Sequence, residues 1–144
     1  AASDVYKRQL KDHGIKPDED LIRHMRPEIK SYSMESGYVL TRELLDSGKE
    51  FTAIFALSDT MAVGACRAIV EAGKKVPEDY SVAGFDGIEL CSYYNPTLTT
   101  IRQPIQHIAE ASVKLLFDIL AGRSGHQHKV FAGELLEQES TAKR

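Results

Sequence analysis

Two short apolar runs separated by a helical pattern constrain the fold of this chain more than any other feature. Phe51–Leu57 is almost continuously apolar, which is typical of a strand buried on both faces. Ser58 and Asp59 then open a stretch of helical spacing, which ends at Gly73. Tyr80–Phe85 is the second apolar run, and the order strand, helix, strand predicts a right-handed β–α–β unit with a parallel sheet.

The flanking sequence predicts further helices and strands, which together define an α/β fold class. Ser33 can cap a helix over Met34–Ser47. Pro104 opens the longest helix, which runs to about Ala121 and carries one apolar face. The other expected elements are a helix ending at Gly14, a strand with a loop over Ile22–Tyr32, a short helix or loop from Leu90 to Tyr94, an extended segment over Leu98–Gln103, and strands over Lys129–Ala132 and Leu135–Glu139.

The composition argues against several classes of function. The 144 residues carry 18 Lys+Arg against 21 Asp+Glu, so the chain offers no basic face for the phosphates of nucleic acid. Cys66 and Cys91 fit neither a zinc spacing nor a disulfide framework. His126 and His128 lie in a polar connector without a third ligand nearby, so we expect no metal there. No apolar run approaches the roughly 20 residues that a membrane-spanning helix needs.

Polar side chains follow both predicted strands of the β–α–β unit. Open parallel sheets bind ligands beyond the carboxyl ends of their strands. Ser58 and Asp59 follow the first strand, Asp86 follows the second, and Gln103 precedes the long helix. These four residues would supply acceptors and an amide for a polyhydroxylated small molecule, and they contain no nucleophile–base pair. Each also has a structural explanation, because Ser58 or Asp59 can cap the helix, Asp86 can form an Asx turn with Gly87, and Gln103 can be solvated.

The first residues look foreign to the rest of the chain. Ala1–Gln9 matches the in-frame translation of a transposon-based sequencing adapter. Such segments are excluded from reasoning about the fold. We therefore expect the native sequence to begin at Leu10, as the C-terminal piece of a longer protein.

Several motifs in unbroken order resemble the lac and galactose repressor family. Phe51–Ala65 is similar to its AIFA-N-D-x-MA-x-GA signature, and Val76–Asp86 to its VP-x-D-x-S-V-x-G-F-D motif. Pro96–Pro104 is similar to the family's P-x-LTT-I-x-QP stretch. Tyr32–Tyr38 resembles its aromatic-x-x-x-SGY stretch, and Glu134–Thr141 resembles its EL-x-x-R-x-ST ending.

The resemblance implies a bacterial transcription regulator with a two-lobed, periplasmic-binding-protein-like (type I) effector domain. This chain would supply mainly the C-terminal lobe over residues 10–100. Residues 101–131 would form a crossover, a helix and a strand of the N-terminal lobe, and residues 132–144 would return to the C-terminal lobe and end in a tail. Operator DNA would be reached only through a helix-turn-helix headpiece that precedes this chain. The implied protein is cytoplasmic, uses no cofactor and is not an enzyme.

The resemblance also implies roles for individual residues. Tyr32 matches the aromatic residue on which the effector ring stacks, and Asp86 matches the aspartate that binds effector hydroxyls. Ser58 stands where the family has a ligand-binding asparagine, so it lacks the amide donor. Gln103 matches a hinge-side position that reaches the ligand. A sugar-like effector is the implied ligand, since an aromatic face packs on C–H groups while a carboxylate accepts from hydroxyls.

A homodimer is the second implied partner. Val63, Tyr93 and Tyr94 match positions in the family's dimer interface, whereas core packing is the alternative explanation of these apolar residues. Two other functions stay open: an exported sugar-binding protein of an ABC transporter, and a glycoside hydrolase with Asp59 and Asp86 as paired carboxylates. The long helix would lack its partner lobe, so we expect the isolated chain to be unstable or to aggregate.

Overall fold

The predicted β–α–β unit is present and lies at the centre of the fold. β1 (Ala53–Phe55) pairs in parallel with β2 (Ser81–Ala83), and α3 (Asp59–Glu71) connects them. Ile54 is the register partner of Val82. Beyond β2 the sheet continues into the segment before β3, through a parallel bridge between Ala83 and Thr99.

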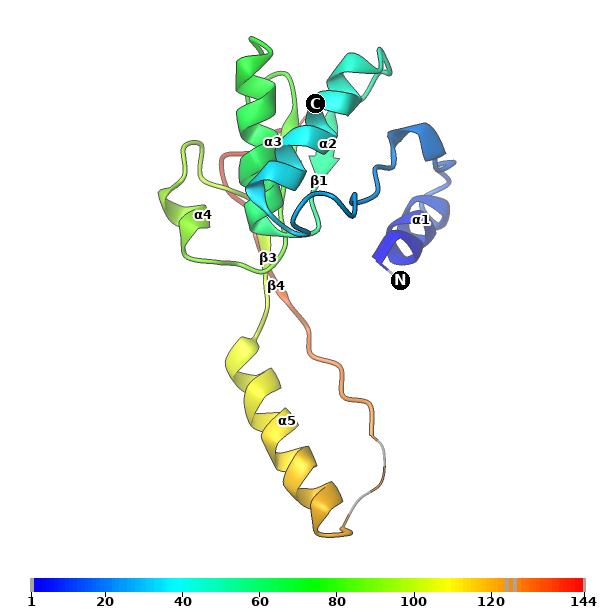
Figure 1. Cartoon of the computed structure of the whole chain (residues 1–144), viewed down its shortest axis with the longest axis vertical. Helices are drawn as coiled ribbons and strands as arrows, with labels where there is room; N and C mark the ends of the chain where they lie inside the picture. Colours follow the sequence, from blue (N-terminus) through cyan, green and yellow to red (C-terminus); the bar gives the residue numbers. More distant parts are fainter. Residues whose placement is uncertain (1, 124, 126, 144) are drawn as a thin grey trace.

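The computed structural model describes residues 2–123, 125 and 127–143. His126, one of the two connector histidines, lies outside these residues. The remaining elements are α1 (Ala2–Asp12), the short 3-10 helix η1 (Glu19–Leu21), α2 (Met34–Asp46), α4 (Leu90–Tyr93), β3 (Thr100–Arg102), α5 (Ile105–Leu120) and β4 (Glu134–Leu136). In Figure 1, α2, α3 and α4 surround the strands, α1 lies to one side, and α5 extends away from the rest. α1 runs through the segment predicted to be adapter-derived, and the origin of that segment stays a prediction.

The cap predicted for α2 is confirmed in detail. The Ser33 hydroxyl accepts a hydrogen bond from the Ser36 backbone N–H, and the Ser36 hydroxyl accepts one from the Ser33 N–H. This reciprocal capping box satisfies backbone donors that the first turn of a helix leaves free. α2 therefore begins where the sequence predicted, directly after Tyr32.

α2 and α3 pack against each other at two glycines. A Cβ at Gly64 of α3 would overlap the carbonyl oxygen of Met34, and a Cβ at Gly37 of α2 would overlap that of Met61. The two helix backbones are in contact because neither glycine carries a side chain. The apolar core around this contact consists of Leu40, Ala56, Met61, Ala62, Ala65, Cys66, Ile69, Val82, Cys91 and Leu98.

The two cysteines lie in this core and are unpaired. Burial raises the pKa of the Cys66 and Cys91 thiols from 9.0 to about 12. A hydrogen bond to the Asp59 carboxylate is a second cause for Cys91. Neither thiol therefore forms the reactive thiolate near neutral pH in the folded chain.

We expect alkylation of Cys66 and Cys91 to report unfolding. At pH 8 the folded chain should react with iodoacetamide roughly a thousandfold more slowly than the chain in urea, because burial suppresses the thiolate. Mass spectrometry of each cysteine over time measures this difference. The thiol pKa is higher in the folded chain than in the unfolded chain. The protonated thiols therefore contribute their full share to the free energy of unfolding below about pH 9, and this contribution is lost as the pH rises toward 12. Equal alkylation rates in buffer and in urea would contradict the buried placement.

Three predictions about strands are wrong. Ile22–Tyr32 contains no strand, because charged residues and Pro27 interrupt its apolar pattern and no described strand lies beside it. Lys129–Ala132 is irregular, with Val130 95% exposed, because it has no strand partner in the described part of the chain. β1 is not buried on both faces, since the Phe55 residue is 49% exposed.

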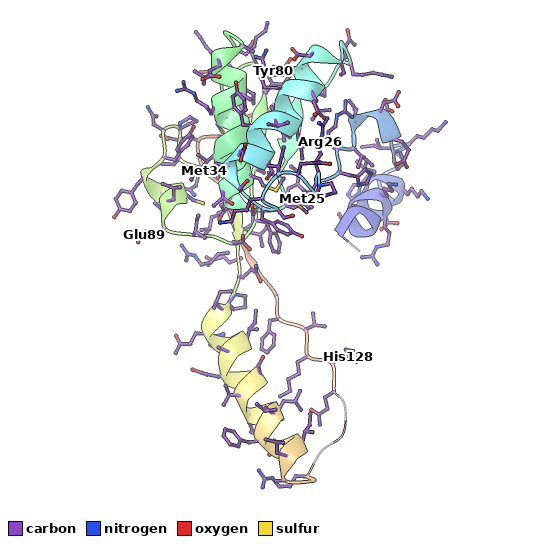
Figure 2. All side chains as sticks on the ribbon, in the orientation of Figure 1. Met25, Arg26, Met34, Tyr80, Glu89 and His128 are labelled. Atoms are coloured by element: carbon purple, nitrogen blue, oxygen red, sulfur yellow. The ribbon has the colours of Figure 1, made fainter. Side chains whose placement is uncertain are left out.

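α5 begins one residue after the predicted start, with Pro104 as its N-cap. Its apolar stripe is exposed: Val113, Leu116, Phe117 and Leu120 are all more than half exposed. Figure 2 shows the side chains of α5 on all sides of a helix that stands apart from the body containing α2 and α3. In the described ranges, no helix, α5 included, is long and apolar enough to cross a membrane.

The chain returns from α5 and is fixed in the central body by its last residues. β4 pairs antiparallel with β3, and Ser140 is then completely buried. The Ser140 backbone accepts a hydrogen bond from Val82 N–H (2.8 Å) and donates one to the Thr97 carbonyl (2.9 Å). Its hydroxyl donates to the Val82 carbonyl (2.6 Å). The final strand predicted over Leu135–Glu139 is thus present as β4, but it covers residues 134–136.

Candidate functional site

The carboxyl ends of β1 and β2 meet at one edge of the sheet, as the sequence predicted. Ser58 follows β1 and Asp86 follows β2. The Asp59 backbone N–H donates to the Phe85 carbonyl at 2.8 Å, which joins the start of α3 to the end of β2. This edge is where parallel α/β sheets bind ligands.

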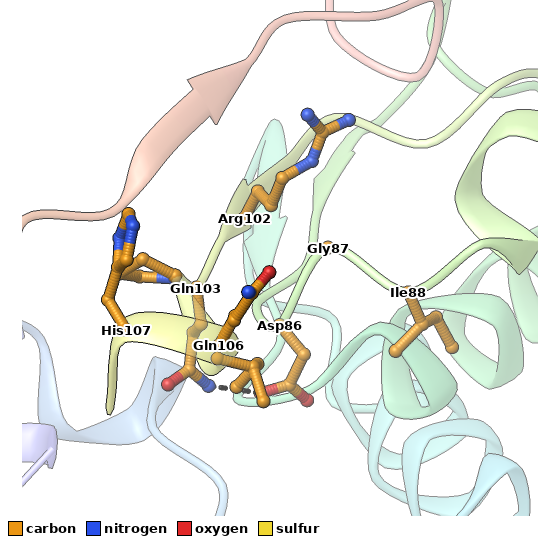
Figure 3. A pocket seen from close by; sticks show the side chains of 9 residues that line it. Asp86, Gly87, Ile88, Arg102, Gln103, Gln106 and His107 are labelled. Atoms are coloured by element: carbon orange, nitrogen blue, oxygen red, sulfur yellow. Dashed lines mark hydrogen bonds between the residues drawn. The ribbon is translucent and has the colours of Figure 1, made fainter. Parts of the chain in front are cut away.

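An open groove of about 640 Å³ lies at this edge, where the extended segment 98–103, called the crossover strand after its expected role, leads into α5. Two of the predicted site residues, Asp86 and Gln103, line it (Figure 3). The full lining is Asp86, Gly87, Ile88, Arg102, Gln103, Pro104, Ile105, Gln106 and His107. Within the part of the chain that the structure describes, no group of three potential metal ligands occurs, here or elsewhere.

Asp86 and Gln103 form a directly bonded pair. The Gln103 side-chain amide donates to Asp86 Oδ1 at 2.7 Å, the dashed contact of Figure 3. The Gln103 backbone N–H donates to the Asp86 carbonyl at 3.1 Å, and the Asp86 N–H donates to the Ile101 carbonyl at 3.0 Å. These bonds tie the loop after β2 to the crossover strand that precedes α5.

The backbone of Asp86 is held in an uncommon conformation. Its φ is +124°, in the region that favours glycine, and the following Gly87 also has a positive φ of +74°. Such a residue costs about 1–3 kcal/mol and persists where its surroundings determine it, often at functional sites. The bonds to Ile101 and Gln103 supply that constraint. Residue type alone suggested a turn at Asp86 but not this conformation.

Tyr32 and Ser58 form a second group at the start of α3. Thr60 joins them: its hydroxyl donates to the Tyr32 carbonyl at 2.6 Å and lies 3.0 Å from the Ser58 hydroxyl. The Ser58 hydroxyl also accepts from the Met61 N–H at 3.2 Å, so Ser58 is the N-cap of α3. Tyr32 has a positive φ of +55° and is 53% exposed. It lines a separate cavity of about 550 Å³, bounded by β1 and α2, rather than the groove at Asp86.

Asp59 differs from the other predicted site residues because it has no exposed surface. Its Oδ2 accepts hydrogen bonds from the backbone N–H groups of Gly87 (2.7 Å) and Ile88 (2.9 Å). Its Oδ1 accepts from the Thr100 hydroxyl at 2.6 Å. Both carboxylate oxygens thus accept hydrogen bonds from the protein, and Oδ2 accepts them from the two residues that follow Asp86.

Sequence reasoning missed three residues near the site. Thr60 connects Tyr32 to Ser58, while Arg102 and His107 line the groove with Asp86. The position of Arg102 beside Gln103 in the crossover strand was the available signal. His107 belongs to the first turn of α5, and only the placement of that helix brings it to the groove.

The residues predicted for a dimer interface differ in exposure. Tyr93 of α4 is 77% exposed. Val63 and Tyr94 are partly buried and pack against the core, and burial raises the pKa of the Tyr94 hydroxyl. Tyr93 is therefore the residue whose exposure a second subunit would change most.

An α/β fold with a parallel strand pair and a groove beyond its strand ends is typical of ligand-binding domains. The chain belongs to the family described as "Periplasmic binding protein-like domain", whose model matches residues 3–141. This family membership agrees with the fold class and with the resemblance drawn from the motifs.

The relatives are regulators of transcription. The chain is 40% identical over 137 residues to the HTH-type transcriptional regulator MalR of Clostridium butyricum, covering 95% of this chain and 39% of MalR. A solved LacI family transcriptional regulator from Enterococcus faecium, with bound ribose, is 38% identical, with a TM-score of 0.77 and coverage of 95% of this chain and 49% of that one. The lac repressor dimer bound to operator and an anti-inducer is 30% identical, with a TM-score of 0.82 and coverage of 96% and 46%.

These comparisons show a homologue of LacI-family effector-binding domains. The chain spans about two fifths of the length of MalR and about half of the solved regulators. The named relatives are transcriptional regulators and not transport proteins, which favours the regulator over the exported sugar-binding protein.

Proposed function

We propose that the chain is the effector-binding and dimerisation part of a bacterial transcription regulator, and that its effector is a sugar or a sugar-like polyhydroxylated molecule. The observation that carries the proposal is the Asp86–Gln103 pair in the groove at the strand ends. Operator DNA would be bound through an N-terminal headpiece, as the operator-bound lac repressor relative suggests. The proposed function is ligand binding without catalysis, and it needs no cofactor.

The chemistry of the pair supports a hydroxyl-rich ligand. An ionised carboxylate has about four acceptor positions, and the Gln103 amide uses one on Asp86. Hydroxyl groups of a sugar can donate to the others and to the Gln103 amide oxygen. Tyr32 and Ser58 stay part of the proposed site although they do not line the groove: the exposed Tyr32 ring would pack against ligand C–H groups from the neighbouring cavity, and the buried Ser58 would act at the start of α3. The ribose complex of the Enterococcus faecium regulator supports the same ligand class.

The proposal includes the division of the chain between two lobes. Residues 10–100 would form most of the C-terminal lobe, residues 101–131 would cross to the N-terminal lobe, and residues 132–144 would return. The exposed apolar stripe of α5 supports this division, because a helix that packs on another lobe needs such a face. A ligand would then shift the lobe arrangement only to the extent that it binds the two arrangements differently.

The proposed role of Asp86 is tested by removing its carboxylate. Asp86→Ala and Asp86→Gly should each weaken ribose binding about 5- to 150-fold, because ligand hydroxyls lose a charged acceptor worth about 1–3 kcal/mol. The glycine variant is informative because it tolerates a φ of +124° without strain. Saturation-transfer NMR with ribose, followed by a panel of hexoses and disaccharides, detects affinities down to the millimolar range.

The matched control is Glu89→Ala, which removes an exposed carboxylate outside the groove lining. It should bind as the unaltered chain does. Sugar binding that persists in both Asp86 variants would refute the role of Asp86. No signal from any sugar with the full-length regulator, which carries both proposed lobes, would count against the sugar-like effector.

The proposed homodimer is tested at Tyr93. Tyr93→Asp should lower the dimer association constant at least tenfold, because it would bury an unpaired charge between subunits. Since Tyr93 is 77% exposed, the stability of the single subunit should change little. Sedimentation velocity over a concentration series measures the association, with Tyr32→Asp, also an exposed tyrosine, as the control. The same sedimentation profile for Tyr93→Asp and the unaltered chain would contradict the interface.

A further inference from the structure

Asp59 is a buried carboxylate that accepts hydrogen bonds from the loop after β2 and from β3, and it is also hydrogen-bonded to the Cys91 thiol of α4. It stands at the first position of α3 and has 0% exposed surface. Its Oδ2 accepts from two consecutive backbone N–H groups, those of Gly87 and Ile88. Its Oδ1 accepts from the hydroxyl of Thr100 in β3. A charge-assisted set of this kind is stronger than bonds between neutral groups and fixes the carboxylate in one orientation.

The space around Asp59 is shaped to let this carboxylate reach the loop. A Cβ at Gly84, in the turn after β2, would overlap Asp59 Oδ1 and lie 3.1 Å from its Cα. Gly87 combines a positive φ with close approach to the crossover strand, since a Cβ there would lie 2.5 Å from the Arg102 Cα. Only residues without side chains fit at both places. The loop therefore contacts Asp59 through hydrogen bonds and packs closely against Arg102 of β3.

Asp86 lies directly before the two N–H groups that Asp59 holds. Its own backbone is in the uncommon φ region and has to be kept there by its neighbours. The crossover strand holds Asp86 itself, while Asp59 holds the two residues that follow. Without the Asp59 carboxylate, the N–H groups of Gly87 and Ile88 would lose the buried oxygen that both donate to, and the peptide after Asp86 could rotate.

We infer that Asp59 is a positioning residue, which acts on the effector site by fixing the 86–88 loop and not by contact with the effector. Its consequence for binding rests on the proposed function, whereas its effect on the loop does not. This role replaces the direct contact that the sequence suggested for Asp59. Among the five predicted site residues, Asp59 is the one whose substitution should lower effector affinity indirectly, by displacing Asp86.

Two substitutions at Asp59 separate the effect of its hydrogen bonds from the effect of its negative charge. Asp59→Ala removes the acceptor of the Gly87, Ile88 and Thr100 donors and also of the Cys91 thiol. Asp59→Asn keeps the shape: its Oδ1 can take the two backbone donors, and its amide can donate to the Thr100 hydroxyl, which can turn to accept. A positioning role predicts that Asn rescues most of what Ala loses. The control for general destabilisation is Ile69→Ala, a completely buried position on the same helix whose apolar side chain cannot hydrogen-bond the loop.

The first experiment is hydrogen exchange of the 144-residue chain, read by mass spectrometry on peptides that cover residues 86–88. In Asp59→Ala, exchange of the Gly87 and Ile88 amides should be about tenfold faster or more, since each loses its acceptor. Asp59→Asn should exchange close to the unaltered chain, and Ile69→Ala should not accelerate this loop selectively. Should Asp59→Ala fail to fold, Thr100→Val replaces it, because loss of the Oδ1 contact should also raise exchange at residues 87 and 88. Unchanged exchange in the folded variant overturns the inference.

The second experiment is ribose binding by the same proteins, measured by saturation-transfer NMR. Asp59→Ala should bind at least about tenfold more weakly, with Asp59→Asn restoring most of the affinity. Full affinity in Asp59→Ala, or equal losses in Asp59→Asn and Asp59→Ala, overturns the inference. If the full-length regulator binds no sugar, the proposed function fails, and the exchange experiment alone still decides whether Asp59 holds the loop.

Discussion

Gly64→Ala is expected to destabilise this chain strongly, although it adds only one methyl group. The added Cβ would overlap the Met34 carbonyl oxygen and lie 2.8 Å from the Tyr38 nitrogen and 2.9 Å from the Met34 carbonyl carbon. All of these are backbone atoms of α2, so no side chain can rotate away. Relief requires the two helices to separate, which would open the core around Ala65 and Leu40. We expect a loss of about 3 kcal/mol or more, a large part of the roughly 5–15 kcal/mol that stabilises a domain.

Thermal or urea unfolding followed by circular dichroism measures this loss. Gly125→Ala is the control, because a Cβ there would meet no atom of the described residues within 4 Å. Gly37→Ala should resemble Gly64→Ala, since its Cβ would overlap Met61 on the opposite helix. A Gly64→Ala chain that unfolds at the same midpoint as the unaltered chain would contradict the close packing of α2 on α3.

The exposed stripe of α5 is expected to make the isolated chain self-associate. Val113, Leu116, Phe117 and Leu120 recur at helical spacing and are 55%, 55%, 62% and 73% exposed. Contiguous apolar surface of this kind drives association in water. The double substitution Leu116→Glu and Leu120→Glu should convert aggregates into soluble chains, because charges would interrupt the stripe without touching the core.

Light scattering and sedimentation over roughly a tenfold concentration range measure the effect, because self-association increases with protein concentration. Lys114→Glu, also on α5 but at an exposed polar position, is the control and should aggregate as before. A monomeric unaltered chain with a sharp, cooperative thermal transition would show that the stripe needs no partner.

The parts of the fold that depend on local pattern were predictable. The apolar runs at Phe51–Leu57 and Tyr80–Phe85 became β1 and β2, and Ser33 capped α2, because these features need only neighbouring residues. The strands expected over Ile22–Tyr32 and Lys129–Ala132 failed, because a strand also needs a partner at the correct distance. No such partner lies beside either segment among the described residues.

The candidate site was predictable as a location and less so as a set of roles. Topology brings Ser58 and Asp86 to one sheet edge whatever their side chains do. Residue type could not show that the Asp59 carboxylate turns inward to two backbone N–H groups, since a cap, a ligand contact and a buried acceptor look alike in sequence. The uncommon φ of Asp86 follows from bonds to residues 101 and 103, which sequence distance conceals.

The antiparallel pair of β3 and β4 makes the long helix a removable insertion. Arg102 and Glu134 are register partners, so the chain leaves the central body and re-enters it at neighbouring points. A tight hairpin can join such ends, with an Asn-Gly turn as the shortest connection that matches the strand twist. Replacing residues 103–133 by that turn would give a minimal lobe still closed by Ser140. Protein engineers would thereby gain a small scaffold for grafting and structural work, although it would lack Gln103 and half of the groove.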